Sequence, residues 1–255
     1  MGRALLEAGS ADARTTIAAA LEIAGSPHAG RDAGELVAGS RGVTVGTDAA
    51  AAVAASDVLI DFTRPAGTLV HLAACRGARK AIVIGTTGFE PAQLEAIREA
   101  ARDIAVVFAP NFAIGMLVTF KLVDMASRAL GPDYDVEVFE AHHKLKVDAP
   151  SGTALKLGEV AAAARATTLA KDGVFARHGA TGERKAGTIG FSVVRGGDIV
   201  GDHTVYFAGT GERVEITHRS SSRATYAQGA IRAAKWLSGR APGLYDMDDV
   251  LGLRG

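Results

Sequence analysis

The chain has 255 residues, with 28 basic and 28 acidic side chains and a formal net charge of zero. This balance argues against a nucleic-acid-binding protein, which needs a basic excess to offset the phosphates. Hydrophobic residues make up 48% and charged residues 22% of the chain, which excludes a disordered or collagen-like protein.

No apolar run reaches the length of about 18 residues that a membrane span needs, and residues 1–10 lack the layout of a signal peptide. The single cysteine, Cys75, has no partner for an internal disulfide, and its place in a predicted helix indicates a small buried hydrophobe. We therefore expect a cytoplasmic protein with no membrane partner.

Up to Asn111 the chain alternates short apolar runs with alanine-rich amphipathic stretches, which predicts βα units on a parallel sheet. Ligands bind beyond the carboxyl ends of such strands, so the turns after the last three strands should line one crevice. The predicted strands are Thr15–Leu21, Val58–Phe62, Ala81–Ile84 and Ile104–Phe108, and the predicted helices are Ala66–Arg76 and Pro91–Arg102.

After a long helix predicted over Phe112–Leu130, polar and apolar residues alternate and glycine-rich turns become frequent. This pattern is typical of a mixed or mostly antiparallel sheet in a second domain. A last helix, over Arg223–Ser238, could return to the first domain. The other elements predicted here are strands at Asp135–Glu140, Thr188–Val194, Thr204–Ala208 and Arg213–Thr217 and a helix at Thr153–Ala164.

The strongest functional signal is the run from Glu140 to Thr153. Two histidines and two lysines lie within residues 142–146, and such a cationic site suits an anionic substrate. The run ends in Ser151-Gly152-Thr153 at the start of a predicted helix, where unpaired backbone N–H groups bind a carboxylate well. A histidine near a lysine can also supply a proton near neutral pH.

A lysine-rich surface loop whose Ser151 and Thr153 only cap a helix is the alternative, and composition leaves both interpretations open. Adjacent histidines on a strand point to opposite faces, and no further ligand spacing accompanies them, so we expect no metal site.

Two other segments allow a cofactor interpretation. The turn Gly85-Thr86-Thr87-Gly88 is either a flexible strand-to-helix turn or a loop that a cofactor approaches closely. Glu22 follows Gly2 by 20 residues, the spacing between a dinucleotide glycine motif and the acidic ribose contact. Taken alone, a surface glutamate is common, and Arg64 is best interpreted as a solvated turn residue.

Together these segments resemble the 4-hydroxy-tetrahydrodipicolinate reductase family, formerly called dihydrodipicolinate reductase, over essentially the whole chain. The motifs that carry the resemblance are Asp61-Phe62-Thr63-Arg64-Pro65, Gly85-Thr86-Thr87-Gly88-Phe89, the Glu140–Thr153 run, Thr181-Gly182-Glu183-Arg184, Gly187-Thr188-Ile189-Gly190-Phe191, the Arg195–Thr204 run and Glu215-Ile216-Thr217-His218.

The resemblance implies an α/β fold with a Rossmann-type parallel-sheet cofactor domain, residues 1–112 and 223–255, and a mixed-sheet α+β domain, residues 113–222, that binds substrate and builds a homotetramer. It implies reduction of a cyclic dicarboxylate by NADH or NADPH in the diaminopimelate route to lysine.

By position, His142 looks like the general acid/base and Lys146 its partner in proton donation, with His143, Gly152 and Thr153 on the substrate carboxylate. Glu22 resembles the ribose contact. The segments that resemble the nicotinamide contacts are Gly85, Thr86, Thr87, Ala109, Pro110, Asn111 and Phe112.

The chain departs from the family at its start, where Met1-Gly2-Arg3 stands in place of a first strand and a glycine-rich turn. We expect that strand and turn to be encoded upstream of Met1. Ile23 replaces a frequent arginine beside Glu22, which predicts a preference for NADH over NADPH. The alternatives are an aspartate dehydrogenase, against which the His-His-x-x-Lys run argues, and a cofactor-impaired pseudoenzyme or assembly subunit that binds a small dicarboxylate.

Overall fold

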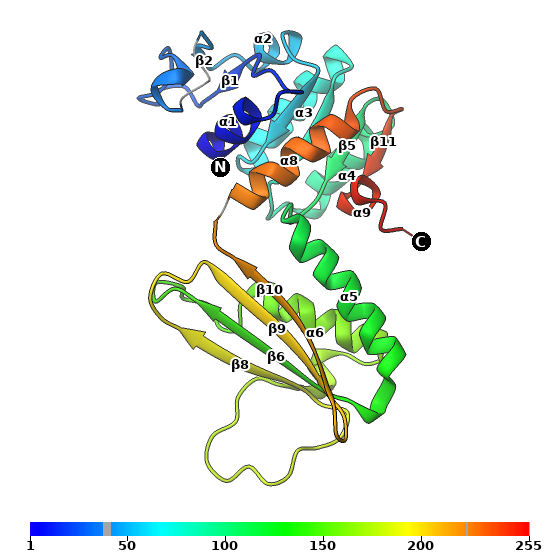
Figure 1. Cartoon of the computed structure of the whole chain (residues 1–255). Helices are drawn as coiled ribbons and strands as arrows, with labels where there is room; N and C mark the ends of the chain where they lie inside the picture. The colour runs from blue at the N-terminus through cyan, green and yellow to red at the C-terminus, as the bar shows by residue number, and fades with distance from the viewer. Residues whose placement is uncertain (38–41, 223, 255) are drawn as a thin grey trace. The chain divides into compact units, whose positions relative to one another are not determined.

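The computed structural model describes residues 1–37, 42–222 and 224–254. The chain divides into two compact units. Figure 1 shows their elements, coloured by residue number from the N-terminus to the C-terminus. We call Met1–Ile114 with Ala224–Gly255 the cofactor unit and Gly115–Arg223 the substrate unit, after the roles that the resemblance implies for them. Residue 223, where the last long helix is predicted to begin, lies outside the described residues.

The cofactor unit is built on a four-stranded parallel sheet of order β11-β5-β4-β3. Short runs rich in valine and isoleucine form β3, β4 and β5, because helices pack on this parallel sheet and its strands must be apolar. The core includes Ile82, Ile84, Ile97 and Val106. The elements are β3 (Val58–Asp61), α3 (Pro65–Ala78), β4 (Ala81–Ile84), α4 (Pro91–Ala100), β5 (Ala105–Phe108), α8 (Ala224–Leu237) and β11 (Gly243–Tyr245).

The strand predicted over Thr15–Leu21 is corrected by the structure. Only β1 (Ala20–Leu21) is extended and paired, and it pairs with β2 (Val45–Gly46) in a separate two-stranded sheet. The Thr15 hydroxyl donates to the Gly9 and Asp12 carbonyls at the end of helix α1 (Gly2–Ala11), and Ile17 packs against Gly9. The apolar character of this segment therefore reflects packing on a helix.

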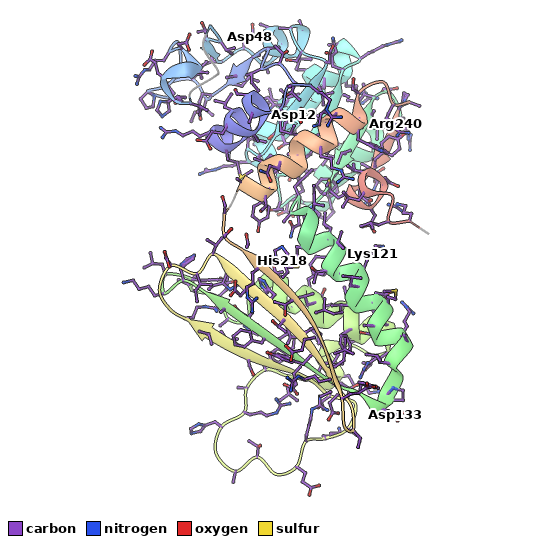
Figure 2. All side chains as sticks on the ribbon, in the orientation of Figure 1. Asp12, Asp48, Lys121, Asp133, His218 and Arg240 are labelled. Carbon is purple, nitrogen blue, oxygen red and sulfur yellow. The ribbon has the colours of Figure 1, made fainter. Side chains whose placement is uncertain are left out.

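Helix α1 itself was not predicted. It packs against α8, and the Asp12 carboxylate, labelled in Figure 2, accepts a hydrogen bond from Lys235 of α8. The other elements of this unit without a sequence prediction are a 3-10 turn at Ala33–Glu35, β2, α2 (Ala49–Ala54), which the Asp48 side chain caps, β11 and α9 (Met247–Leu251).

The substrate unit holds a five-stranded mixed sheet of order β10-β9-β6-β8-β7. The neighbours β10, β9 and β6 are antiparallel, whereas β6, β8 and β7 are parallel. Helix α6 packs on one face of this sheet, as Figure 1 shows. The elements are α5 (Ile114–Leu130), a 3-10 turn at Gly131–Asp133, β6 (Asp135–His142), α6 (Gly152–Ala164), α7 (Leu169–Asp172), β7 (Gly173–Val174), β8 (Ile189–Arg195), β9 (Gly201–Ala208) and β10 (Arg213–Ser220).

The sheet follows the alternation in its sequence. Val136 and Val138 of β6 are buried on the face that α6 covers, and so are their register partners Phe207 and Val205 of β9. None of the helices in the described part of the chain combines the length and the apolarity needed to cross a bilayer.

Candidate active site

Three turns leave the parallel sheet of the cofactor unit at one level. The last residues of β3, β4 and β5, which are Asp61, Ile84 and Phe108, lie side by side in register. The Gly85 amide donates to the Asp61 carbonyl over 2.8 Å, and Gly85 lies so close to the Phe62 ring that a Cβ there would be 2.2 Å from it. The structure therefore brings the first two predicted turns into contact.

A buried network fixes the turn at residues 85–88. The Asp61 carboxylate accepts hydrogen bonds from the Thr63 amide and hydroxyl, each over 2.7 Å, from Nδ1 of His71 over 2.8 Å and from the Thr86 hydroxyl over 3.3 Å. The Thr68 hydroxyl donates to the Thr86 oxygen over 2.9 Å. Burial raises the pKa of Asp61, but the hydrogen bonds from His71 and Thr63 outweigh it, so its pKa is lowered. Asp61 therefore stays ionised.

The third turn, residues 109–112, is partly core. Ala109 and Phe112 are buried, and the Phe112 ring packs 5.3 Å from the Phe62 ring between centroids. Pro110 is exposed and Asn111 half-buried, with the Asn111 side chain accepting from the Ala113 amide. The side chain of Phe112 thus belongs to the interior of the unit, which leaves Pro110 and Asn111 as its accessible neighbours.

Glu22 is exposed directly after β1. Its carboxylate accepts from the Ile23 amide over 3.0 Å, and Ile23 is 75% exposed. Glu22 belongs to the two-stranded sheet, which is separate from the sheet that carries the three turns.

In the substrate unit, a fully buried carboxylate organises the site. Glu140 lies on β6 two residues before His142, so both side chains point to the same face of the sheet. Nδ1 of His142 donates to Oε2 of Glu140 over 2.5 Å. The Arg195 guanidinium, at the end of β8, donates to Oε2 over 2.8 Å and to Oε1 over 2.7 Å. The Ser151 amide donates to Oε1 over 2.9 Å.

Burial raises the pKa of Glu140, but the hydrogen bonds from Arg195, His142 and Ser151 outweigh burial and lower its pKa. Glu140 is therefore ionised at neutral pH. An ionised carboxylate can only accept hydrogen bonds, which fixes the proton of His142 on Nδ1.

Two more histidines lie beside this pair. His203 of β9 is opposite Glu140 in register, its ring centroid is 5.1 Å from that of His142, and its Nε2 is 3.2 Å from the Ser151 hydroxyl. Burial, with the neighbouring His142, lowers the pKa of His203 to about 4. His218 of β10, labelled in Figure 2, is opposite His203 in register, and burial lowers its pKa also.

The N-terminus of α6 is open. The Ser151 hydroxyl caps the helix by accepting from the Ala154 amide, and the Leu155 amide donates to the Ser151 carbonyl. The amides of Gly152 and Thr153 are thus the first-turn donors left for a ligand. A Cβ at Gly152 would meet no atom within 4 Å, so this end of the helix faces free space.

His143 and Lys146 follow β6 in the loop that leads to α6. Nδ1 of His143 is buried and has no hydrogen-bond partner among the described residues. The Lys146 ammonium donates to both carboxylate oxygens of Asp148, over 2.7 and 2.9 Å, so its ion-pair partner in this structure is Asp148.

Sequence reasoning named His142 but missed what holds it. The predicted strand ended at Glu140, whereas β6 continues to His142, so the two-residue spacing that places both side chains on one face could be used only with the longer strand. Arg195 and His203 reach Glu140 and Ser151 only through the pairing of β8 and β9 with β6. In the described ranges, no group of three or more histidine, cysteine, aspartate or glutamate side chains is arranged to hold a metal ion.

One unit is a parallel sheet with its turns gathered at one edge, and the other buries a carboxylate–imidazole pair beside a helix N-terminus. This is the plan of a two-domain α/β protein whose parallel sheet is suited to a dinucleotide, as in many oxidoreductases. Comparisons with known proteins specify the family. Residues 1–112 match the family described as dihydrodipicolinate reductase, N-terminus, and residues 115–251 match dihydrodipicolinate reductase, C-terminus.

The chain is 57% identical over 254 residues to the 4-hydroxy-tetrahydrodipicolinate reductase of Nitrosospira multiformis, covering 100% of this chain and 94% of the relative. It is 58% identical to that of Bordetella pertussis, covering 99% and 94%. The solved structure of dipicolinate-bound dihydrodipicolinate reductase from Paenisporosarcina sp. TG-14 is 24% identical, with a TM-score of 0.74 over 96% of this chain and 92% of that one. This chain therefore belongs to the dihydrodipicolinate reductase family. The resemblance and the two-part α/β fold expected from the sequence are confirmed.

Proposed function

We propose that the chain reduces 4-hydroxy-tetrahydrodipicolinate to tetrahydrodipicolinate with NADH or NADPH and loss of water, in the diaminopimelate route to lysine. The observation that carries the proposal is His142, held by a buried carboxylate beside the open N-terminus of α6. A proton donor and a place for a carboxylate thus occur together, in a chain that matches reductases of this name over its full length.

The substrate is a dianion, and the substrate unit offers it two kinds of donor. The free amides of Gly152 and Thr153 lie at the positive end of the α6 dipole and bind one carboxylate. The buried, unpartnered Nδ1 of His143 is a further polar atom for the same substrate.

The cofactor unit offers a suitable edge for a dinucleotide. Thr87 and Gly88 are exposed at the carboxyl ends of the strands, and Gly88 has a φ of +83° with open space on its Cβ side. NADH or NADPH would be held by Gly85, Thr86, Thr87, residues 109–112 and Glu22. Ala109 and Phe112, whose side chains are buried, would contribute only backbone groups. The bound cofactor supplies the hydride.

The proton comes from the substrate unit. Loss of the hydroxyl as water and delivery of hydride leave an electron-rich centre that must be protonated, and His142 is the acid that does so through Nε2. Lys146 is its partner in proton donation, and Asp148 holds the Lys146 ammonium in place.

The test is oxidation of NADH, followed by absorbance, with 4-hydroxy-tetrahydrodipicolinate supplied. The His142→Gln variant should lose about 100-fold or more in kcat, because a positioned acid contributes that much. Lys171→Gln, at an exposed residue of α7, serves as the control and should stay within about twofold of wild type. Near-normal turnover and substrate affinity in His142→Gln would remove His142 from this role.

The NADH preference is proposed from Glu22 and Ile23. Glu22 would repel the 2′-phosphate of NADPH, and the exposed Ile23 offers no cation to compensate. The Ile23→Arg variant should raise kcat/KM for NADPH about tenfold relative to NADH, whereas Ile23→Gln should not. A wild-type KM clearly lower for NADPH would contradict the preference.

The chain is further proposed to act in the cytoplasm as a homotetramer. On the sheet face opposite α6, Phe139, Tyr206 and Val194 place apolar surface toward solvent, and Val194 is 41% exposed. Light scattering on the eluted protein should give four times the chain mass of 26.1 kDa. A mass of one chain at micromolar concentration would refute the assembly.

A further inference from the structure

Glu140 is the one carboxylate that contacts both halves of the proposed substrate site among the described residues. Its Oε2 accepts from His142, the proposed acid, and its Oε1 accepts from the amide of Ser151, the cap of the helix that would bind the substrate carboxylate. No part of its side chain is exposed to solvent. The side chain accepts hydrogen bonds from His142, Ser151 and Arg195, so it is held by the protein itself.

The contact with Glu140 decides which nitrogen of His142 can exchange a proton. Because the ionised carboxylate holds the Nδ1 proton, Nε2 is the nitrogen left to face a reacting group. Nε2 lies on the side of Gly201, where a Cβ would be 3.1 Å from it. The glycine at this position keeps side-chain atoms away from Nε2.

Arg195 makes a buried carboxylate compatible with an anionic substrate. A bare charge at Glu140 would repel a dianion, and the two parallel hydrogen bonds from Arg195 compensate that charge. The same guanidinium donates to the Asp148 carbonyl over 2.6 Å, so it also fastens the loop that carries Lys146. The strand register places Arg195 directly beside His142.

We propose that Glu140, clamped by Arg195, is the positioning residue of the reductase: it holds His142 by the proton on Nδ1, so that Nε2 is the nitrogen that gains and donates a proton, and it ties that ring to the N-terminus of α6. The inference rests on the proposed function for its consequence in catalysis. The tautomer of His142 is a property of the protein alone, so that part is tested without substrate.

The first experiment reads the tautomer in the wild-type protein. Nitrogen NMR of protein labelled in its histidine rings, with His142→Gln used to assign the signal, should show that Nδ1 of His142 keeps its proton as the pH is varied and that Nε2 is the nitrogen that gains and loses one. A neutral ring protonated at Nε2 would overturn the inference, whatever the activity of the protein. This measurement needs no variant of Glu140 and is decisive even if such a variant does not fold.

The second experiment compares two carboxylates of the same strand. Glu137 of β6 is half-buried and also accepts hydrogen bonds from arginine, here from Arg177 and Arg184, but it lies on the opposite face of the sheet. Glu140→Gln should lower kcat at least about tenfold with the KM for NADH unchanged, because a wrongly held imidazole is a poor acid. Glu137→Gln, the matched control, should stay within about twofold of wild type.

Equal kcat in the two variants would overturn the positioning role. Arg195→Lys, which keeps the positive charge, should retain more activity than Arg195→Gln, and the reverse order would count against the clamp. Failure of the proposed function would give a different result. The wild-type protein would then not oxidise NADH when the dicarboxylate is supplied, while the NMR measurement could still find His142 in the expected tautomer.

Discussion

His203 makes the stability of the substrate unit depend on pH. Burial and the neighbouring His142 lower its pKa from 6.5 to about 4, so the folded chain favours the neutral ring. The unfolded chain takes up a proton near pH 6.5 and the folded chain only near pH 4. The stabilisation is therefore complete above about pH 6.5 and is lost as the pH falls towards about 4.

A shift of this size corresponds to about 3 kcal/mol. Urea unfolding at about pH 7.5 and about pH 4.5 should show a smaller loss of stability in His203→Asn than in wild type. His178→Asn, at an exposed histidine, should behave as wild type. The carboxylates of Glu140 and Asp61 also lose their stabilising effect in acid, in every variant. The test is therefore the difference between His203→Asn and wild type in the free energy of unfolding lost between the two pH values. An identical loss in all three proteins would contradict the role of burial.

At the scale of single residues, the sequence could predict a cationic site with a proton donor but not the contacts that hold these side chains in place. The histidines and lysines of residues 142–146 stand next to one another in the chain, so a cationic site could be inferred without a structure. The contacts of Glu140 with Arg195 span 55 residues, and those of Ser151 with His203 span 52. Such contacts depend on strand order, which neither periodicity nor spacing encodes.

The turns of the cofactor unit depend on the element that supports them. Asp61 ends β3 and holds Thr86 of the next turn, so its loss should affect both folding and cofactor binding. Asp61→Asn should destabilise the chain by about 1–3 kcal/mol, because an amide cannot accept all four hydrogen bonds, and should raise the KM for NADH. Thermal unfolding and steady-state kinetics measure the two effects.

Asp57→Asn is the matched control for this element. Asp57 precedes the same strand, its side chain is 95% exposed, and its distance to Lys80 is 3.9 Å. We expect a change within about 0.5 kcal/mol and an unchanged KM. Equal effects of the two substitutions would show that the network around Asp61 does not support the turn.

Helix α8 supports the third turn by close approach. A Cβ at Gly229 would lie 1.8 Å from the Phe112 carbonyl oxygen, so only glycine allows this contact. Gly229→Ala should destabilise the chain by about 1–3 kcal/mol through displacement of the helix or the turn. Gln228→Ala, on the exposed side of the same helix, should be neutral in thermal unfolding. A neutral Gly229→Ala would mean that the contact adjusts freely.

Helices and strands could be predicted where the hydrophobic pattern of a segment matches the way its neighbours bury it. The run Ala81–Ile84 is buried on both faces between two parallel neighbours, and four consecutive apolar residues predict just such a strand. The segment Thr15–Leu21 has a similar composition, but its Thr15 and Ile17 contact the end of α1, and composition does not distinguish a strand face from a helix contact. Short elements such as β11 and α9 depend on tertiary contacts and carry little pattern of their own.

At the scale of the whole molecule, a net charge of zero says nothing about where individual charged side chains are buried. Each unit contains a buried carboxylate, Asp61 in the cofactor unit and Glu140 in the substrate unit, and each carboxylate has a histidine partner. Both carboxylates have a lowered pKa although burial alone would raise it. The overall charge of the sequence therefore argued against nucleic acid as a partner but gave no indication of these two centres.

The reactivity of Cys75 can report how often the cofactor unit opens. It is the only cysteine of the sequence, it is fully buried in α3, and burial, with the charge of Asp61, raises the pKa of its thiol to about 12. The thiol is thus neither accessible nor ionised in the closed unit, and a disulfide reagent should react only during an opening event. NADH at about 100 times its dissociation constant should slow that reaction about 100-fold, since it binds the closed form. Fast labelling unaffected by NADH would contradict this, whereas slow labelling gives the opening rate of the cofactor unit without an added probe site.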